Sequence, residues 1–222
     1  LKEITDLISK PSNVYYELTI IDGWQKYQMH ELIKRKFNTI NNIKYTEIFA
    51  DTYYYQAHDT YTDIYSFMKK SKENYFNDYF DNILFNEFTQ DEIMIISSLV
   101  EKEGINDDDK RLISSVIFNR LKNKMKLQID ASTIFSITQG KYKFERKLSL
   151  NDLNIVDQYN TYYIYGLPPT PICFVSRKTI EIVLENYNSD YLFYFYNDKL
   201  KKHIFSRTFS KHKEKLNKYR QN

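Results

Sequence analysis

Two glutamates separated by a single residue, Glu101 and Glu103, are the side chains of this sequence best suited to acid–base chemistry. They follow a long apolar run and stand just before Gly104. A carboxyl group on an apolar surface keeps its proton to higher pH, because its ionised form is disfavoured there. A carboxyl that is protonated near neutral pH can act as a general acid, for example in the cleavage of a glycosidic bond.

The run from Thr89 to Gly104 predicts one helix of about four turns. Thr89 and Glu92 form a capping-box pattern at its start. Gly104 is the residue type that ends helices in the left-handed conformation. Both ends of this helix are therefore predicted by the local sequence.

Helical spacing places the two acids on different faces of this helix. Glu103 lies over apolar side chains of the preceding turns, namely Val100, Leu99 and Ile96. Glu101 lies over a wetter set, namely Ser98, Ser97 and Met94. Burial and the negative end of the helix dipole then predict that Glu103 stays protonated. Two solvated acids at a fraying helix end are the alternative, and from the helix alone they are the commoner case.

The composition argues against several other kinds of site. The chain has 222 residues and a net charge of +3, from 32 basic and 29 acidic side chains, so a nucleic-acid partner is not indicated. A single cysteine, Cys173, excludes an internal disulfide. The four histidines show no recognised ligand spacing, so we predict neither a metal nor a cofactor.

No apolar run approaches the ~18 residues of a membrane span. The sequence begins with Leu rather than Met. We therefore expect a soluble fragment of a longer protein.

The first part of the chain predicts a strand and a helix. Alternation predicts a half-buried strand over residues 13–20, with one face formed by Val14, Tyr16, Leu18 and Ile20. Asp22-Gly23 then turns the chain, and helical spacing predicts a helix that ends before Asn38. We expect Trp24 to pack at the turn rather than to stack on a ligand.

A second strand and helix complete this part. Residues 48–56 are extended and rich in tyrosine, and a capping box at Thr60–Asp63 opens a helix that reaches about Phe85. The pattern then restarts. We therefore predict an α+β protein, with a small module over residues 1–87 and a mixed, helix-rich domain with a short antiparallel sheet over residues 88–222.

The second domain is predicted to contain helices around a proline-rich loop. The expected elements after Gly104 are a helix through Leu121 with residues 107–109 as its caps, an extended segment over 125–132, a short helix near 133–138, a helix from Ser176 to Asn186, a hairpin over 191–206 and a last helix after Ser210.

Residues 159–172 form the second informative stretch. Three prolines within four positions exclude a helix or a central strand, so this is a rigid loop. Just ahead of the prolines it carries Tyr159, Asn160, Thr161 and Tyr162. Amides and aromatic rings on a rigid loop suit flat, polar ligands such as sugars, although a purely structural turn is nearly as well supported.

Several motifs, in a fixed order, carry a resemblance to a known family. They are Ser-Leu-Val-Glu-Lys-Glu (98–103), Val-Ile-Phe-Asn-Arg-Leu (116–121), Leu-Gln-Ile-Asp (127–130), Tyr-Asn-Thr-Tyr (159–162), Gly-Leu-Pro-Pro-x-Pro-Ile (166–172) and His-Ile-Phe-Ser (203–206). With them the chain resembles the endolytic murein transglycosylases of the MltG type, also called YceG-like proteins. Asp22-Gly-Trp and Ala50-Asp-Thr-Tyr look like two further motifs of that family.

The resemblance implies an enzyme with a LysM-like module ahead of its catalytic domain. Such enzymes cut nascent peptidoglycan strands between N-acetylmuramic acid and N-acetylglucosamine without water, and they leave a 1,6-anhydro end. The resemblance also implies a single N-terminal helix, absent from this chain, that anchors the protein in the bacterial inner membrane with its catalytic domain on the periplasmic or outer face. Peptidoglycan synthases are the implied protein partners.

The family's catalytic glutamate aligns with Glu103, and Glu101 is the reserve candidate. The substrate-binding residues that the resemblance implies are Asn119, Arg120, Gln128, Asp130, Tyr159, Asn160, Thr161, Tyr162, Pro168, Pro169, His203 and Ser206. Asn119 and Arg120 are expected to orient their neighbours. The chain departs from the family pattern at Ala131 and Thr170, where the family usually has Pro and Gly.

Two other functions fit the same sequence. One is a non-catalytic scaffold that holds peptidoglycan near the synthases. The other is a hydrolase that uses water. Retention of Glu103, Asn160 and the proline-rich loop favours the transglycosylase over the scaffold.

Overall fold

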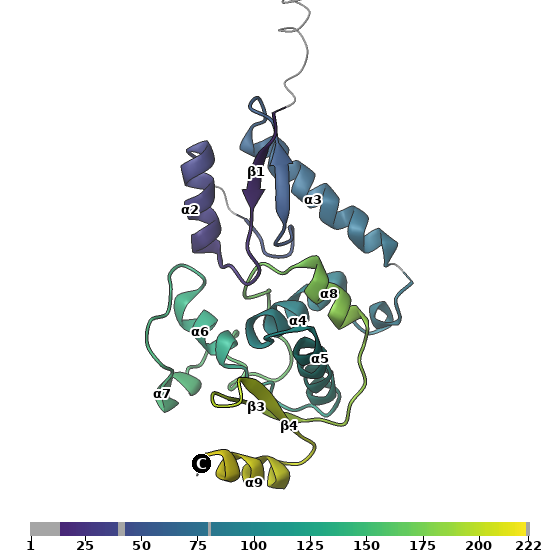
Figure 1. The fold of residues 1–222 in the computed structure, drawn as a ribbon, viewed down its shortest axis with the longest axis vertical. Coiled ribbons are helices and arrows are strands. Elements are labelled where there is room, and N and C mark those ends of the chain that lie inside the picture. Colours follow the sequence, from purple (N-terminus) through teal and green to yellow (C-terminus); the bar gives the residue numbers. More distant parts are fainter. Residues whose placement is uncertain (1–13, 40–42, 80, 221–222) are drawn as a thin grey trace, which may run out of the picture.

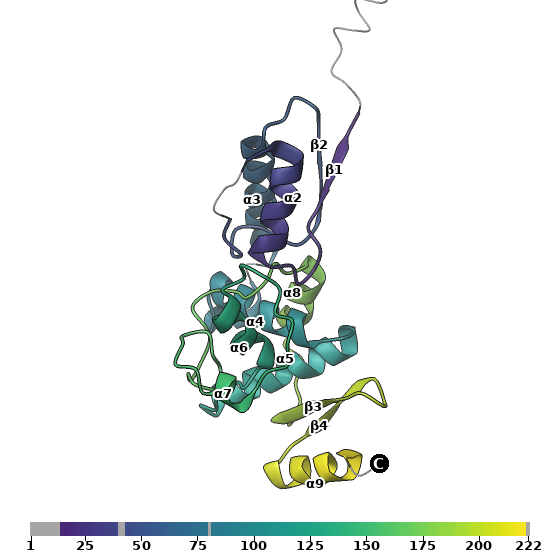
Figure 2. The same cartoon turned by 90° about the vertical axis from the view of Figure 1, so that its left-hand side faces the viewer.

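The molecule is arranged in three layers along its long axis (Figures 1 and 2). The computed structural model describes residues 14–39, 43–79 and 81–220. An α+β module lies at one end, a group of helices in the middle, and a two-stranded hairpin with the last helix at the other end. The α+β class with short antiparallel sheets is therefore confirmed.

The N-terminal module consists of strand β1 (Tyr16–Thr19), helix α2 (Lys26–Phe37), strand β2 (Thr52–Tyr55) and helix α3 (Tyr61–Asp78). The strands pair antiparallel, and both helices lie on one face of the pair (Figure 2). Leu18 and Tyr53 oppose each other and are buried. Val14 and Tyr16, predicted to share the face of Leu18, are exposed, so that face reaches the core only at its later positions. Asn13 lies outside the described residues.

Helix α3 is shorter than predicted. It begins with the expected capping box but ends at Asp78 rather than near Phe85. A 3-10 helix, η1 (Ile83–Asn86), follows it. Asn82 caps η1, and its amide also donates to the carbonyl of Leu184 at 3.1 Å. The Asn82 side chain thus holds the segment after α3 against the end of α8.

The middle layer packs around helix α4. Its helices are α4 (Gln90–Glu103), α5 (Asp107–Lys122), α6 (Asp130–Thr138), α7 (Leu150–Leu153) and α8 (Arg177–Leu184). The capping box of Thr89 and Glu92 is confirmed. All residues from Ile93 to Val100 are buried, so α4 is covered on every side by its neighbours. The extended segment predicted over 125–132 forms no strand, and α6 already begins at Asp130.

Gly104 ends α4 for a different reason from the predicted one. Its backbone is extended, with φ −78° and ψ 138°, and not left-handed. A Cβ at this position would lie 2.3 Å from Cγ of Lys110. Glycine is therefore needed here because α5 approaches the end of α4 closely, and not because the turn requires a positive φ.

The module and the middle layer share one hydrophobic core. The segment Ile172–Ser176 runs between them. The amide of Gly23 donates to Phe174 O at 2.9 Å, and the amide of Ala50 donates to Val175 O at 2.8 Å. Trp24 packs against this core, as expected. The division at residue 87 stays a prediction, because packing is continuous across it.

The last layer is the predicted hairpin of β3 (Phe193–Asn197) and β4 (Lys202–Ser206), followed by α9 (Phe209–Arg220). Alternate side chains point to opposite faces. Phe193 and Phe195 meet His212 of α9. Tyr194 and His203 contact each other on the opposite face, which is turned toward the helices of the middle layer. Among the described residues, no helix combines the length and the apolar character needed to cross a membrane.

Replacing Gly104 with Ala should destabilise the fold. The added methyl overlaps Lys110 and also lies 3.2 Å from Val100 O, so either the side chain or the helix end must move. Overpacking of this kind costs about 1–3 kcal/mol, which denaturant unfolding can measure.

Gly166→Ala is the matched control. Gly166 has φ +82° with no atom within 4 Å of the added methyl, so Gly166→Ala should lower the unfolding free energy only by the backbone cost of about 1 kcal/mol. A Gly104→Ala protein as stable as wild type would contradict the packing role.

Candidate active site

Glu103 is the last residue of α4, and its carboxyl faces three other elements. The hydroxyl of Tyr194 on β3 donates to Oε2 at 3.3 Å. Asp130 at the start of α6 and His203 on β4 lie close enough to act on its charge. Burial, and after it the negative charge of Asp130, raises the pKa of Glu103 above 4.5, while His203 and the bonds from Tyr194 and the Ala131 amide act in the opposite direction. The predicted direction of this shift is confirmed.

Asp130 stands beside this acid as an exposed carboxylate. The hydroxyl of Tyr162 donates to its Oδ1 at 2.6 Å. Burial and this bond raise the pKa of Tyr162, so the phenol keeps its proton and remains a donor. Tyr162 therefore fixes the direction of a carboxylate that lies next to Glu103.

Asn119 and Arg120 both donate to backbone carbonyls of nearby segments, and a part for either in substrate binding stays a prediction. The guanidinium of Arg120 is buried and donates to Leu192 O at 2.7 Å and to Leu127 O at 2.7 Å. Burial lowers its pKa. The amide of Asn119 donates to Tyr191 O at 2.9 Å. Together they hold the start of the hairpin against the segment that leads to Asp130.

In the loop over residues 159–162, most side chains are buried and bond to neighbouring segments instead of facing solvent. Asn160 is fully buried, and its Oδ1 accepts from Thr133 and from the amide of Tyr162. Its Nδ2 donates to two further carbonyls, so its amide is already saturated. Thr161 is equally buried and accepts from the amide of Ile129 at 2.9 Å. Of this motif, Tyr162 is the residue that meets Asp130.

The remaining predicted binding residues differ in how far they are exposed. Tyr159 is buried and bonds to Thr170, which replaces the family's usual glycine. Pro168 is buried and Pro169 is exposed. Gln128 is exposed, with a left-handed backbone at φ 55°.

Ser206 is buried, and its hydroxyl has no partner among the described residues. Contact of Ser206, Tyr159, Pro168, Pro169 or Gln128 with substrate stays a prediction.

Glu101 is buried rather than wet, which corrects the expectation for its face. Its side chain is 5% exposed and forms an ion pair with Lys110 at 2.7 Å. Lys110 also bonds to Thr179, and Ser176 donates to Glu101 at 3.1 Å. Of the two serines on this face, Ser98 donates to Ile95 O, whereas the buried hydroxyl of Ser97 has no partner among the described residues. Glu101 thus joins α4, α5 and α8.

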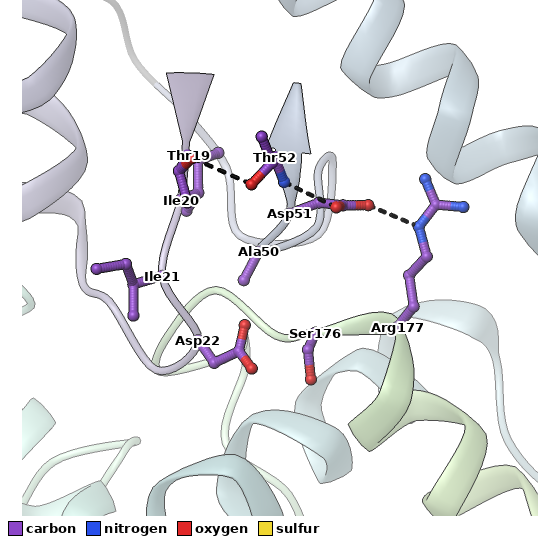
Figure 3. Close-up of a pocket in the computed structure, with 9 residues that line it drawn as sticks. All are labelled: Thr19, Ile20, Ile21, Asp22, Ala50, Asp51, Thr52, Ser176 and Arg177. Carbon is purple, nitrogen blue, oxygen red and sulfur yellow. Dashed lines mark hydrogen bonds and ion pairs between the residues drawn. The ribbon is translucent and has the colours of Figure 1, made fainter. Parts of the chain in front are cut away.

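A surface cavity of about 470 Å³ lies at the junction with the N-terminal module (Figure 3). Asp22 and Ser176 face each other across it, and the ion pair of Asp51 with Arg177 lines one side. Burial, and after it the charge of Glu101, raises the pKa of Asp22. Neither Glu101 nor Glu103 lines this cavity, although Ser176, which does, donates to Glu101.

Two residues of the candidate site could not be identified from the sequence. Tyr194 is one of 21 tyrosines, and nothing in the sequence marks it out. Asp109 was expected only to cap α5, but Asn106 is the N-cap, and Asp109 lies in the first turn, where its carboxylate accepts from the amide of Ile105. It also bonds to Nδ1 of His203 at 2.7 Å, which its spacing could not indicate. No group of side chains able to hold a metal ion occurs in the described part of the chain.

Known proteins similar to this chain share one family description. A family model described as the YceG-like family matches residues 1–218. The endolytic murein transglycosylase of Bacillus subtilis is 32% identical over 173 residues, which cover 78% of this chain and 47% of that protein. The protein of the same name from Streptococcus pneumoniae is 31% identical over 150 residues, covering 66% of this chain and 27% of that protein. The chain thus spans less than half the length of these relatives.

A solved structure shares the fold. A yceG-like protein from Listeria monocytogenes superposes with a TM-score of 0.77 at 22% identity, covering 96% of this chain and 79% of that one.

The two acids should respond differently to amidation. Glu101→Gln leaves the buried Lys110 without a charged partner, so we expect it to cost about 3 kcal/mol of unfolding free energy. Glu103→Gln should not destabilise at neutral pH. Folding raises the pKa of Glu103, so the native state opposes ionisation of this carboxyl, whereas the unfolded state ionises it freely. Wild type should therefore lose unfolding free energy relative to Glu103→Gln as the pH rises above about 4.5, the ordinary pKa of the group.

Denaturant unfolding of both variants and wild type from pH 4 to 8 measures this. Equal losses for the two variants, or a gap between wild type and Glu103→Gln that does not grow with pH, would contradict the assignment.

Proposed function

The chain belongs to the YceG-like family, and on that premise we propose that it cleaves peptidoglycan as part of an endolytic murein transglycosylase. The observation that carries the proposal is a glutamate with a raised pKa, Glu103, beside the exposed carboxylate of Asp130. Two relatives at 31% and 32% identity bear that enzyme name, although each is longer than this chain. Peptidoglycan is therefore the proposed substrate, and the chain is proposed to be a lyase.

The chemistry needs one carboxyl in two protonation states. Protonated Glu103 donates its proton to the glycosidic oxygen between N-acetylmuramic acid and N-acetylglucosamine, and the bond from that oxygen to C1 breaks. The muramoyl C6 hydroxyl then bonds to C1 and returns its proton to the Glu103 carboxylate. The product carries a 1,6-anhydro end, and the acid is restored without water.

Asp130 is the proposed stabiliser of the positive charge that develops on the sugar ring. Its exposed carboxylate is held by Tyr162 and lies near Glu103. Asn160, another predicted substrate-binding residue, is not assigned this role, because its amide already bonds to protein groups on both sides. Tyr162 and Asp130 therefore carry the stabilisation in this proposal.

The family resemblance also motivates a proposed location. The protein would act at the outer face of the bacterial inner membrane, held there by an N-terminal helix outside these 222 residues. Peptidoglycan synthases are its proposed neighbours.

Glu103→Gln should abolish cleavage, since it keeps the shape of the side chain and removes the proton. Uncrosslinked glycan strands digested with the purified protein, with product masses read by mass spectrometry, test this. Wild type should yield 1,6-anhydro ends, and Glu101→Gln, assayed at a temperature where it is folded, should yield them too. Reducing ends would indicate a hydrolase, and intact strands with wild type would indicate a scaffold; full activity of Glu103→Gln would move the acid elsewhere.

Asp130→Asn should lower kcat by roughly 10²-fold, because it removes a charge that faces the developing cation. It should also lower the pKa of Glu103, since the negative charge of Asp130 is one of the causes that raise it. The alkaline limb of the pH–rate profile should then move to lower pH. If Asp130→Asn has the same kcat as wild type and an alkaline limb at the same pH, Asp130 has no part in the mechanism.

A further inference from the structure

A buried acid–histidine pair joins the hairpin to the end of α4. Oδ2 of Asp109 accepts from Nδ1 of His203 at 2.7 Å and from the amide of Ile105 at 3.1 Å. The two side chains are 9% and 6% exposed. Ile105 follows Glu103 by two residues, so one carboxylate oxygen holds both β4 and the turn that leaves the acid-bearing helix.

The ring of His203 passes this restraint to Tyr194. It contacts the rings of Tyr194 and Tyr196, with centroid distances of 5.4 and 5.2 Å. Tyr196 is its direct partner in the strand register, and Tyr194 lies on the same face of β3. The hydroxyl of Tyr194 in turn reaches Glu103. A continuous set of contacts therefore runs from Asp109 to the acid.

The hairpin needs such a restraint. A two-stranded sheet is only marginally stable by itself, so its position depends on what its side chains touch. Asn119 and Arg120 fix the chain at Tyr191 and Leu192, just before β3 begins. Asp109 and His203 fix the hairpin farther along, where β4 meets the first turn of α5.

Resting on the proposed function, we propose that Asp109 and His203 are positioning residues that hold the Tyr194 hydroxyl on the carboxyl of Glu103. A donor on a carboxylate stabilises its ionised form. The pair therefore limits how tightly Glu103 keeps its proton, and it aims the oxygen that must take a proton back from the substrate.

Titration of Glu103 tests this without any substrate. The carboxyl carbon of Glu103 can be followed by NMR in protein labelled with 13C-glutamate and assigned by its absence in Glu103→Gln. The titratable groups that face it are Asp130 from α6, Tyr162 from the 159–162 loop, Tyr194 from β3 and His203 from β4, with Arg120 of α5 acting on the two tyrosines. All of them stay in place unless substituted.

Tyr194→Phe should raise the pKa of Glu103 by roughly half a pH unit, because a donor to its carboxylate is lost. His203→Phe keeps a ring but cannot bond to Asp109, and it should raise the pKa by a similar amount. His203→Asn keeps a donor and should stay closer to wild type. Adding His203→Phe to Tyr194→Phe should raise the pKa less than His203→Phe alone does, because only the direct charge effect of His203 on Glu103 is left once the hydroxyl is gone.

Asp109→Ala decides between positioning and direct charge effects. Removing a nearby negative charge lowers the pKa of Glu103 by Coulomb's law, whereas losing the Tyr194 contact raises it. We expect a rise. A fall, or a rise from His203→Phe that is as large without the Tyr194 hydroxyl as with it, would overturn the proposal. If Asp109→Ala does not fold, Asp109→Asn takes its place with the same expected direction.

The alkaline limb of strand cleavage should move with the NMR titration in each variant. Should Glu103→Gln stay active while the NMR shifts follow the expected pattern, the proposed acid fails and the positioning pair stands. Should Glu103→Gln be inactive while the pKa of Glu103 ignores Asp109 and His203, the pair fails and the proposed function stands.

Discussion

The burial of helix α4 on every side is the constraint on which the site depends. Because its neighbours cover all of Ile93 to Val100, the last turn delivers two acids into two enclosed environments. Glu101 meets Lys110 and becomes a charged structural link, whereas Glu103 meets a tyrosine hydroxyl and another carboxylate. The same helix therefore supplies one acid that forms an ion pair and one whose pKa is raised by burial, although the two residues are only two positions apart.

Much of the fold followed from local signals. The capping boxes at Thr60 and Thr89, the end of α2 before Asn38 and the C-terminal hairpin were all predicted, because caps and alternation are encoded within a few residues. The raised pKa of Glu103 followed from the helical spacing of its apolar neighbours. These are cases in which the nearest sequence neighbours decide the outcome.

The errors came from contacts between distant segments. Ser97 and Ser98 suggested a wet face for Glu101, but α8, some eighty positions later, covers it. Gly104 was expected to adopt a left-handed backbone conformation, but its backbone is extended and glycine is needed there to leave space for Lys110. Tyr194 and Asp109 entered the site through pairings that no local pattern contains. The family motifs supplied the candidate residues, and the coordinates separated those that face Glu103 from those, such as Asn160, that brace it.

In the proposed mechanism, the proton on Glu103 is the one given to the glycosidic oxygen. The most direct measurement compares the NMR titration of this carboxyl with the alkaline limb of strand cleavage by wild-type protein, in the same buffer and at the same temperature. The account predicts that the two midpoints coincide and that both lie above the usual carboxyl value of 4.5. A carboxyl that is already ionised at a pH where cleavage is still at its maximum would contradict it.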